Sequence, residues 1–195
     1  MTRTLRRRVL ILQVGLIGIL GFVAGFLFWA NSFSHGMVRD QLSAQQIYFP
    51  PAGSQALNPQ EFPDLQQYAG QQVVNGDQAK AYADGFIGRH LQAVAGGQTY
   101  AQVSTKSLAN PTDTKLAGQV QTLFRGETLR GLLLNAYGWW QVGQYAFYAA
   151  VGLVVAAIAV FGALIFELWR WAFAVRKERP ILAPTTRTME PRPTS

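Results

Sequence analysis

The sequence predicts an all-α membrane protein in which two transmembrane helices flank an all-helical extracytoplasmic domain. Three observations lead to this prediction. Two long apolar blocks, residues 9–30 and 146–166, contain no charged side chain. Unbalanced basic residues gather beside these blocks. The segment between the blocks has repeated helix-capping patterns and only weak strand signals.

The first apolar block, residues 9–30, is 22 residues long. As an α-helix it would rise about 33 Å, which is enough to cross a hydrocarbon core of roughly 30 Å. A secretory signal peptide is the alternative, but its apolar region is usually about 7–15 residues and ends at small residues. Bulky aromatic residues follow this block, so we expect a retained anchor, with cleavage near Ser34 as the minor alternative.

The formal net charge of +7 is carried by the flanks of the two blocks. Residues 31–144 hold seven basic and seven acidic side chains, so this segment has no formal net charge. Basic flanks predict that both termini are cytoplasmic and the loop lies outside. The same residues would face anionic lipid heads, which removes the motive for nucleic-acid binding. The predicted organisation is a cytoplasmic N-terminus (1–8), transmembrane helix 1 (9–30), an extracytoplasmic helical domain (31–144), transmembrane helix 2 (145–167) and a basic, Pro/Thr-rich cytoplasmic tail (168–195).

The chain has no cysteine, which excludes disulfides, thiolate metal sites and cysteine nucleophiles. A loop of 114 residues is large enough to be held by its own core. Together with the abundance of Ala, Gly and Gln, this composition favours the plasma membrane of a bacterial cell envelope as the location.

The first helix is predicted to continue beyond the membrane as far as Tyr48, because Pro50 and Pro51 stop it. Residues 50–70 have four prolines and no helical periodicity, which predicts an ordered wrap or a linker. Three capping patterns then predict helix starts, at Asn75, Thr99 and Asn110. On the first of these helices we expect one apolar face, formed by Ala79, Tyr82, Ala83, Phe86, Ile87, Leu91 and Val94.

The stretch RGETLRGLLLNAYGWWQVG, residues 125–143, is predicted to join the outer domain to the second span. An unbroken helix over 111–171 would be about 90 Å long, so part of it must stand outside the membrane. Gly138 and Gly143 are possible bend points. The predicted interfacial belt has tryptophans at the outer level (Trp29, Trp139 and Trp140) and at the inner level (Trp169 and Trp171).

Small residues line one face of each span and form a candidate helix-packing face. They are Gly15, Gly18, Gly21 and Gly25 on the first span, and Gly152, Ala156, Ala159 and Ala163 on the second. Contact between the chain's own two spans is the first interpretation, and self-association or a partner helix is the other.

Arg125, Glu127 and Arg130 form a candidate outer ion-pair or anion site. The favoured interpretation is a network inside the domain that reaches Arg39 and Asp40 on the first helix. Exposed pairs alone are worth less than about 1 kcal/mol, which favours such a network or a solvated surface. The alternative is that Arg125 and Arg130 bind a ligand carboxylate or phosphate.

No catalytic, cofactor-binding or metal site is predicted. His35 and His90 have no second ligand at helical spacing, so an interfacial and a surface histidine are favoured over a metal site or pH sensor. Glu61 and Asp64 are interpreted as solvated turn residues rather than a catalytic pair. Hydrolase and nucleotide-binding fingerprints are missing.

Two stretches, AKAYADGFIGRHLQAVAGGQTYAQVS and KLAGQVQTLFRGETLRGLLLNAYG, resemble small two-span membrane proteins of actinobacterial type with no assigned function. The resemblance covers most of the outer domain and its exit, and it implies no activity. A ring-opening dioxygenase, a label associated with similar chains, would need a His/His/carboxylate iron site, which this sequence lacks.

These observations predict a non-enzymatic accessory or scaffold subunit of a membrane complex. Its outer domain would bind a partner protein, lipid or small ligand, and the spans would contact membrane lipid and another membrane protein. A homo-oligomer is possible. The first alternative is an extracytoplasmic sensor that signals through transmembrane helix 2, and the second is a membrane-anchored enzyme.

Overall fold

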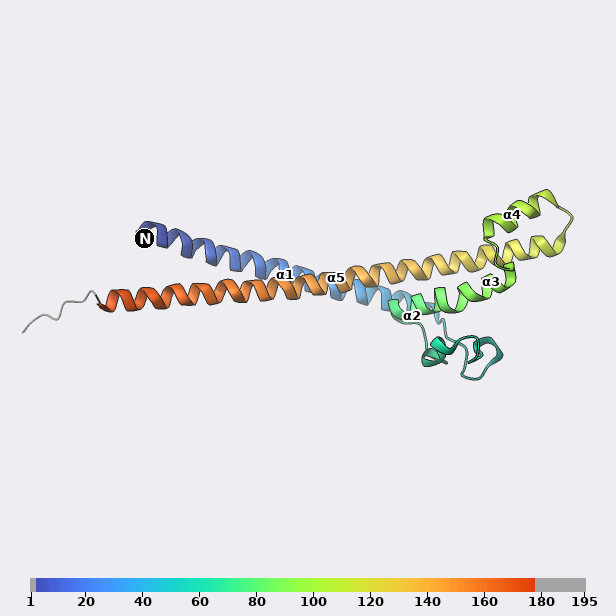
Figure 1. Ribbon diagram of the computed structural model, residues 1–195, viewed down its shortest axis with the longest axis horizontal. Helices are drawn as coiled ribbons and strands as arrows, with labels where there is room; N and C mark the ends of the chain where they lie inside the picture. The colour runs from blue at the N-terminus through green and yellow to red at the C-terminus, as the bar shows by residue number, and fades with distance from the viewer. Residues whose placement is uncertain (1–2, 178–195) are drawn as a thin grey trace, which may run out of the picture. The chain divides into compact units, whose positions relative to one another are not determined.

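A computed structural model of the protein describes residues 3–177, so most of the predicted tail, from residue 178 onward, lies outside the described residues. The described chain is entirely helical apart from loops and one isolated bridge between Tyr48 and Gln72. This confirms the predicted all-α class. The elements in order are α1 (Arg3–Gln45), η1 (Gln55–Leu57), η2 (Pro63–Tyr68), α2 (Gly76–Lys80), η3 (Ala81–Gly88), α3 (Arg89–Ala95), α4 (Tyr100–Ala109) and α5 (Thr114–Lys177) (Figure 1).

Two of these helices, α1 with 43 residues and α5 with 64, are long and apolar enough to cross a membrane. By contact density the chain divides into a unit of residues 22–153 and a second unit of residues 1–21 with 154–195. The second unit, as far as it is described, consists of the end segments of the two long helices. The larger unit holds the rest of the fold, including residues 46–113, which we call the cap.

Helix α1 ends three residues earlier than predicted, at Gln45 rather than Tyr48. Gln46 adopts a left-handed conformation with φ of 51°, which turns the chain before the prolines are reached. The next residues pair with the far end of the wrap, since the Phe49 amide donates to the Gln71 carbonyl at 2.9 Å. Backbone pairing therefore ends the helix.

The wrap between residues 50 and 70 is ordered around three buried apolar side chains. Leu57 belongs to η1, Leu65 belongs to η2, and Phe62 lies between them; none is more than 4% exposed. Of the two alternatives left open by the sequence, the structure has the ordered wrap. The burial of side chains offsets the lack of regular hydrogen bonding.

The first predicted cap helix is confirmed as one continuous helical segment over α2, η3 and α3. The Asn75 side chain accepts from the Gln78 amide at 2.8 Å, as the capping pattern predicts. The segment ends at Gly96, whose φ of 58° places it in the left-handed conformation common after helices.

The middle of that segment, η3, is a π-helix of eight residues, which the sequence pattern does not predict. Its hydrogen bonds span five residues instead of four, so each turn holds more residues than an α-helical turn. The buried positions therefore run Ala83, Ile87, Leu91 and Ala95, at intervals of four. Val94, which was predicted to face inward, is 38% exposed.

Helix α4 begins with the predicted capping box between Thr99 and Gln102. Helix α5, however, does not begin at Asn110. The Asp113 carboxylate accepts a hydrogen bond from the Leu116 amide at 2.9 Å. Asp113 is therefore the N-cap residue of α5, and the helix starts at Thr114. The Asn110 side chain donates to the Lys106 carbonyl and closes the end of α4.

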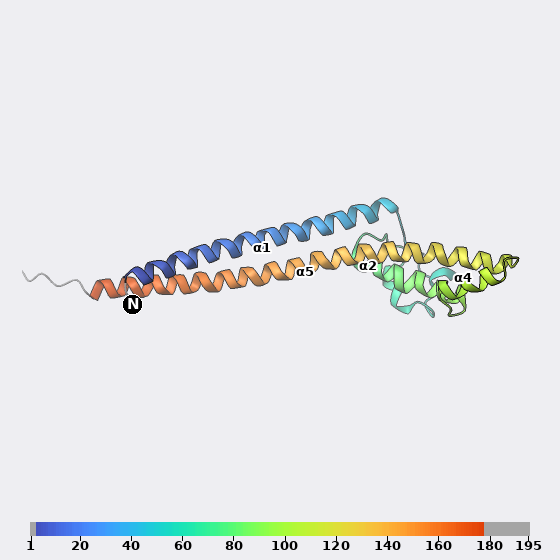
Figure 2. The ribbon, with the colours of Figure 1, turned by 90° about the horizontal axis from the view of Figure 1, so that it is seen from above.

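The cap packs along the first part of α5, and both views show α2 and α4 beside it (Figures 1 and 2). Phe49 is 1% exposed at the centre, where its ring stacks on Tyr68 and meets the edge of Tyr82. Leu123 and Leu133 contribute the α5 side of the same core. The helix itself continues through Gly138 and Gly143 without a break.

Candidate functional site

The polar side chains Asn31, Ser34 and His35 lie on one face of α1, because they are spaced by three and four residues. Each of them reaches a backbone carbonyl of α5. Ser34 Oγ donates to the Trp139 carbonyl at 2.6 Å, and Asn31 Nδ2 donates to the Gly143 carbonyl at 2.9 Å. His35 Nε2 lies 3.1 Å from the Trp140 carbonyl oxygen. We call these three residues, together with Trp140 and Gly143, the helix joint.

The two helices approach so closely at the joint that a side chain at position 143 has no room. A β-carbon on Gly143 would lie 2.8 Å from His35 Cδ2 and 3.2 Å from Ser34 Cβ. The His35 ring also stacks on the Trp140 indole, with centroids 3.8 Å apart. On the cap side, Trp140 leaves no space for a β-carbon on Gly76. The Trp140 side chain thus packs between α1 and the first residue of α2.

This packing changes the interpretation of the tryptophan belt. Trp140 is part of the joint rather than a freely exposed interfacial residue. Within the larger unit the contacts pair residue 28 with 147 and residue 35 with 140, so Trp29 is level with Ala146. Trp139 and Trp140 therefore lie six to seven residues nearer the cap, a distance of about 10 Å. Trp169 and Trp171 are both exposed, at 57% and 50%.

Arg130, the centre of the predicted ion-pair site, joins α5 to the cap. Its guanidinium donates to Asp84 Oδ1 at 3.0 Å and to Glu127 Oε2 at 3.3 Å. Hydrogen bonding to Asp84 raises the pKa of Arg130, so the side chain stays charged. Lys80 lies 3.6 Å from the same aspartate. Arg125 is exposed and is not brought into the described network.

The prediction that this network reaches Arg39 and Asp40 is wrong. Both are exposed on α1, while the acid that Arg130 contacts is Asp84, 46 residues away in η3. The network therefore fastens α5 to the π-helix. No sequence spacing could have identified Asp84, because the pair forms between separate helices.

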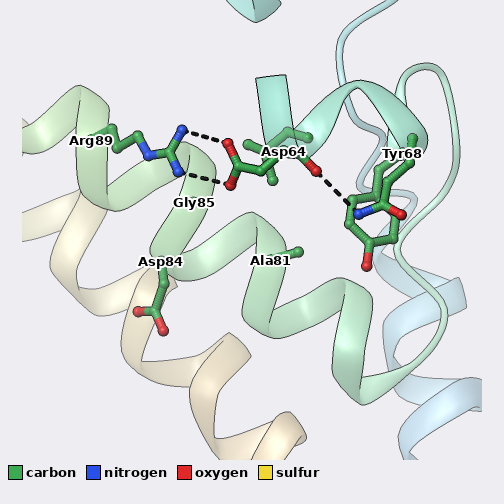
Figure 3. A pocket seen from close by; sticks show the side chains of 8 residues that line it. Asp64, Tyr68, Ala81, Asp84, Gly85 and Arg89 are labelled. Atoms are coloured by element: carbon green, nitrogen blue, oxygen red, sulfur yellow. Dashed lines mark hydrogen bonds and ion pairs between the residues drawn. The ribbon is translucent and has the colours of Figure 1, made fainter. Parts of the chain in front are cut away.

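A shallow groove of about 380 Å³ lies between η2 and η3 (Figure 3). On one side Arg89 makes a bidentate pair with Asp64, with N···O distances of 2.9 and 2.7 Å. These hydrogen bonds lower the pKa of Asp64 below its ordinary value. The Asp84 side chain points away from this pair, towards α5 (Figure 3). Each carboxylate of the groove is thus already matched by a cation.

Both acids of the wrap, Glu61 and Asp64, are in contact with Arg89, but through different groups. Arg89 Nη1 donates to the Glu61 backbone carbonyl at 3.1 Å, so it is the backbone of Glu61 that takes part. Asp64 holds the wrap to α3 through a charge-assisted bond. Across residues 3–177 there is no group of three potential metal ligands, and this includes the surroundings of His35 and His90.

The small-residue faces are open in the structure. A β-carbon built on Gly15, Gly18, Gly21, Gly25 or Gly152 would meet nothing within 4 Å. The alanines predicted to continue the second face, Ala156, Ala159 and Ala163, are exposed as well. The interpretation as a contact between the chain's own two helices is therefore wrong. The buried positions of α1 in the larger unit are Ala24, Ser34, Val38 and Leu42, on a face of the helix centred away from the glycines.

Sequence reasoning missed the joint, although one signal was present. Asn31, Ser34 and His35 follow an apolar block directly and share a helix face, a pattern that indicates contact with another polar surface. Their partners are backbone carbonyls, which leave no signal in the sequence. Comparisons of the chain with protein-family models, curated proteins and solved structures give no match.

Proposed function

We propose that the protein is a non-enzymatic integral membrane protein of the bacterial plasma membrane that binds another membrane protein, as an accessory or scaffold subunit. The observation that carries this proposal is the open face of α1. Gly25 meets nothing within 4 Å, and Trp29 and Phe33 on the same side are 59% and 58% exposed. The chain's own pairing uses other residues of α1, such as Ala24 and Ser34, which leaves the glycine positions open to a partner.

The chemistry of this face fits a helix from another protein. Glycines let two backbones approach closely, which is how transmembrane helices associate when lipid is as apolar as they are. The rings of Phe26, Trp29 and Phe33 form a continuous row next to Gly25: Phe26 and Trp29 are tilted with centroids 5.6 Å apart, and Trp29 and Phe33 are stacked at 5.5 Å. This row offers an apolar edge beside the glycine face.

The lengths of the apolar segments of α1 and α5 support the proposed position of each helix in the membrane. Trp29 lies 21 positions after Arg8, which corresponds to about 32 Å of helix. Glu167 lies 22 positions after Tyr145, or about 33 Å. Both agree with a hydrocarbon core of roughly 30 Å. In this arrangement the joint and the cap lie outside, and the basic flanks orient both termini towards the cytoplasm.

Copurification in a gentle detergent, followed by mass spectrometry, tests the proposal. We expect the wild-type chain to recover a second membrane protein and the Gly21→Leu/Gly25→Leu variant to lose it. Gly162→Leu is the matched control, because it makes the same change at an open position outside both small-residue faces. A wild-type chain that elutes strictly alone, or only with its own copies, would overturn the proposal, and so would full partner recovery by the double variant.

A sensor is the second candidate, favoured by the unbroken course of α5 from the cap to its last described residue. Movement of the cap could reach the second span through this helix. Deleting residues 180–195 distinguishes the candidates, because a sensor would lose its output while an accessory subunit would keep its partner.

A further inference from the structure

The hydrogen bonds around His35 fix the protonation state of its ring. Nε2 lies 3.1 Å from the Trp140 carbonyl, an acceptor, so Nε2 carries a hydrogen. Nδ1 lies 3.5 Å from Asn31 Nδ2. That amide nitrogen is identified by its other partner, because it donates to the Gly143 carbonyl. Nδ1 therefore faces a donor, and the joint is complete only with a neutral ring.

Protonation of His35 would place two N–H groups opposite each other. Asn31 relieves this conflict by turning its oxygen to Nδ1, and its amide nitrogen then leaves the Gly143 carbonyl. The bond from Nε2 to Trp140 survives, and stacking on an indole favours the cationic ring. The break therefore falls on the link between Asn31 and Gly143.

No other charge is positioned to cancel this effect. On α1 the nearest charged residues are Arg39 and Asp40, one turn or more beyond His35 and both exposed. On α5 there is no charged residue between positions 131 and 166. On α2, Asp77 is exposed and Lys80 lies over the Tyr137 ring, 4.8 Å from its centroid. In the described part of the chain, none of these groups makes an ion pair or hydrogen bond with His35.

His90, the other histidine of the chain, has the opposite arrangement. Its Nδ1 lies 2.9 Å from the Phe86 carbonyl, so Nδ1 carries the hydrogen. The residue is exposed, and a second proton on Nε2 would break no described hydrogen bond. The chain thus contains one histidine whose protonation breaks a contact between helices and one whose protonation does not.

We propose that His35 is a proton-sensitive latch. With a neutral ring it holds α1 against α5. On acidification the ring is protonated, Asn31 is released from the Gly143 carbonyl, and the contact between the two helices loosens. This device is independent of the proposed partner and requires only the contacts of the joint.

Distances between spin labels test the latch in the full-length protein. The chain has no cysteine, so Ser32→Cys and Val142→Cys place labels on exposed positions of α1 and α5 without background. Between pH 8 and pH 5 we expect the label distance to shift by about 1–2 Å, the usual size of helix movements at interfaces, or its distribution to broaden. His90→Gln should leave this response unchanged.

Two further variants separate the latch from ordinary titration of a histidine. His35→Gln keeps a donor for the Trp140 carbonyl but cannot titrate, so the response should be lost. Asn31→Ala keeps the imidazole and removes the opposing donor, so the response should be lost in this variant as well. The two variants are independent tests, so a folding defect in one of them leaves the other to decide. The proposal is overturned if the labelled wild-type protein shows no change with pH, or if either variant keeps the full response.

Discussion

Replacing Gly143 with leucine is expected to destabilise the protein by about 1–3 kcal/mol, seen as a fall of about 5–10 °C in Tm. The new side chain would begin 2.8 Å from the His35 ring, and it can be accommodated only if α1 and α5 move apart. That movement would lengthen the hydrogen bonds from Asn31 and Ser34 to α5. Thermal unfolding of the purified protein in detergent, followed by circular dichroism, measures the effect.

Gly138→Leu is the matched control for this experiment. It makes the same change five residues earlier on α5, where a β-carbon would meet nothing within 4 Å. Leucine has a higher helix propensity than glycine, so Tm should be unchanged or slightly raised. Equal losses at positions 138 and 143 would contradict the close approach of the two helices at the joint.

Replacing Phe49 with alanine is expected to have the largest effect on the cap, a loss of about 3–5 kcal/mol. The ring is 1% exposed and contacts both Tyr68 and Tyr82, so its removal opens a cavity between the wrap and η3. The Phe49 backbone bond to Gln71 would remain. We expect Tm to fall by about 10 °C or more.

The neighbouring residue supplies the comparison for Phe49. Tyr48 is 54% exposed, and Tyr48→Ala removes an aromatic ring without opening a core cavity. Its effect should stay within about 0.5 kcal/mol, as is usual for surface substitutions. A Phe49→Ala protein as stable as Tyr48→Ala would show that the aromatic cluster does not hold the wrap in place.

Helix starts were predictable where the deciding contacts are local. Asn75 and Thr99 cap their helices through residues three positions away, which a sequence shows directly. The start of α5 was misplaced because both Asn110 and Asp113 carry a suitable oxygen within the same four residues. Pro111 fits the first turn of a helix but also fits the turn in which it lies.

The register of a helix and the partner of a side chain could not be predicted where contacts with distant segments determine them. The π-helix moves Val94 outward and Ala95 inward, although both are small apolar residues that fit an α-helical pattern. Arg130 was identified as a network residue, but its partner Asp84 is set by how the cap packs on α5. The joint depends on carbonyl oxygens of α5, which every residue has.

The same limit explains the glycine faces. Their spacing indicates close helix contact, but it does not say which helix is the partner. The buried face of α1 uses Ala24 and the polar residues of the joint instead. At the joint, the side chains of α1 donate hydrogen bonds to backbone carbonyls of α5. The contact between these two helices therefore does not need the glycines. This leaves the glycine face as the part of α1 whose sequence pattern is unexplained by the fold.

Accessibility of single cysteines in intact cells tests most directly whether the cap lies outside the membrane. Gln55→Cys in the wrap and Asp77→Cys on α2 are exposed positions in a chain without cysteine, and Thr4→Cys marks the opposite end of α1. With a membrane-impermeant maleimide, we predict labelling at 55 and 77 in intact cells and at 4 only after permeabilisation. Labelling at 4 in intact cells, with 55 and 77 protected, would contradict the outward placement of the cap and the partner surface proposed beside it.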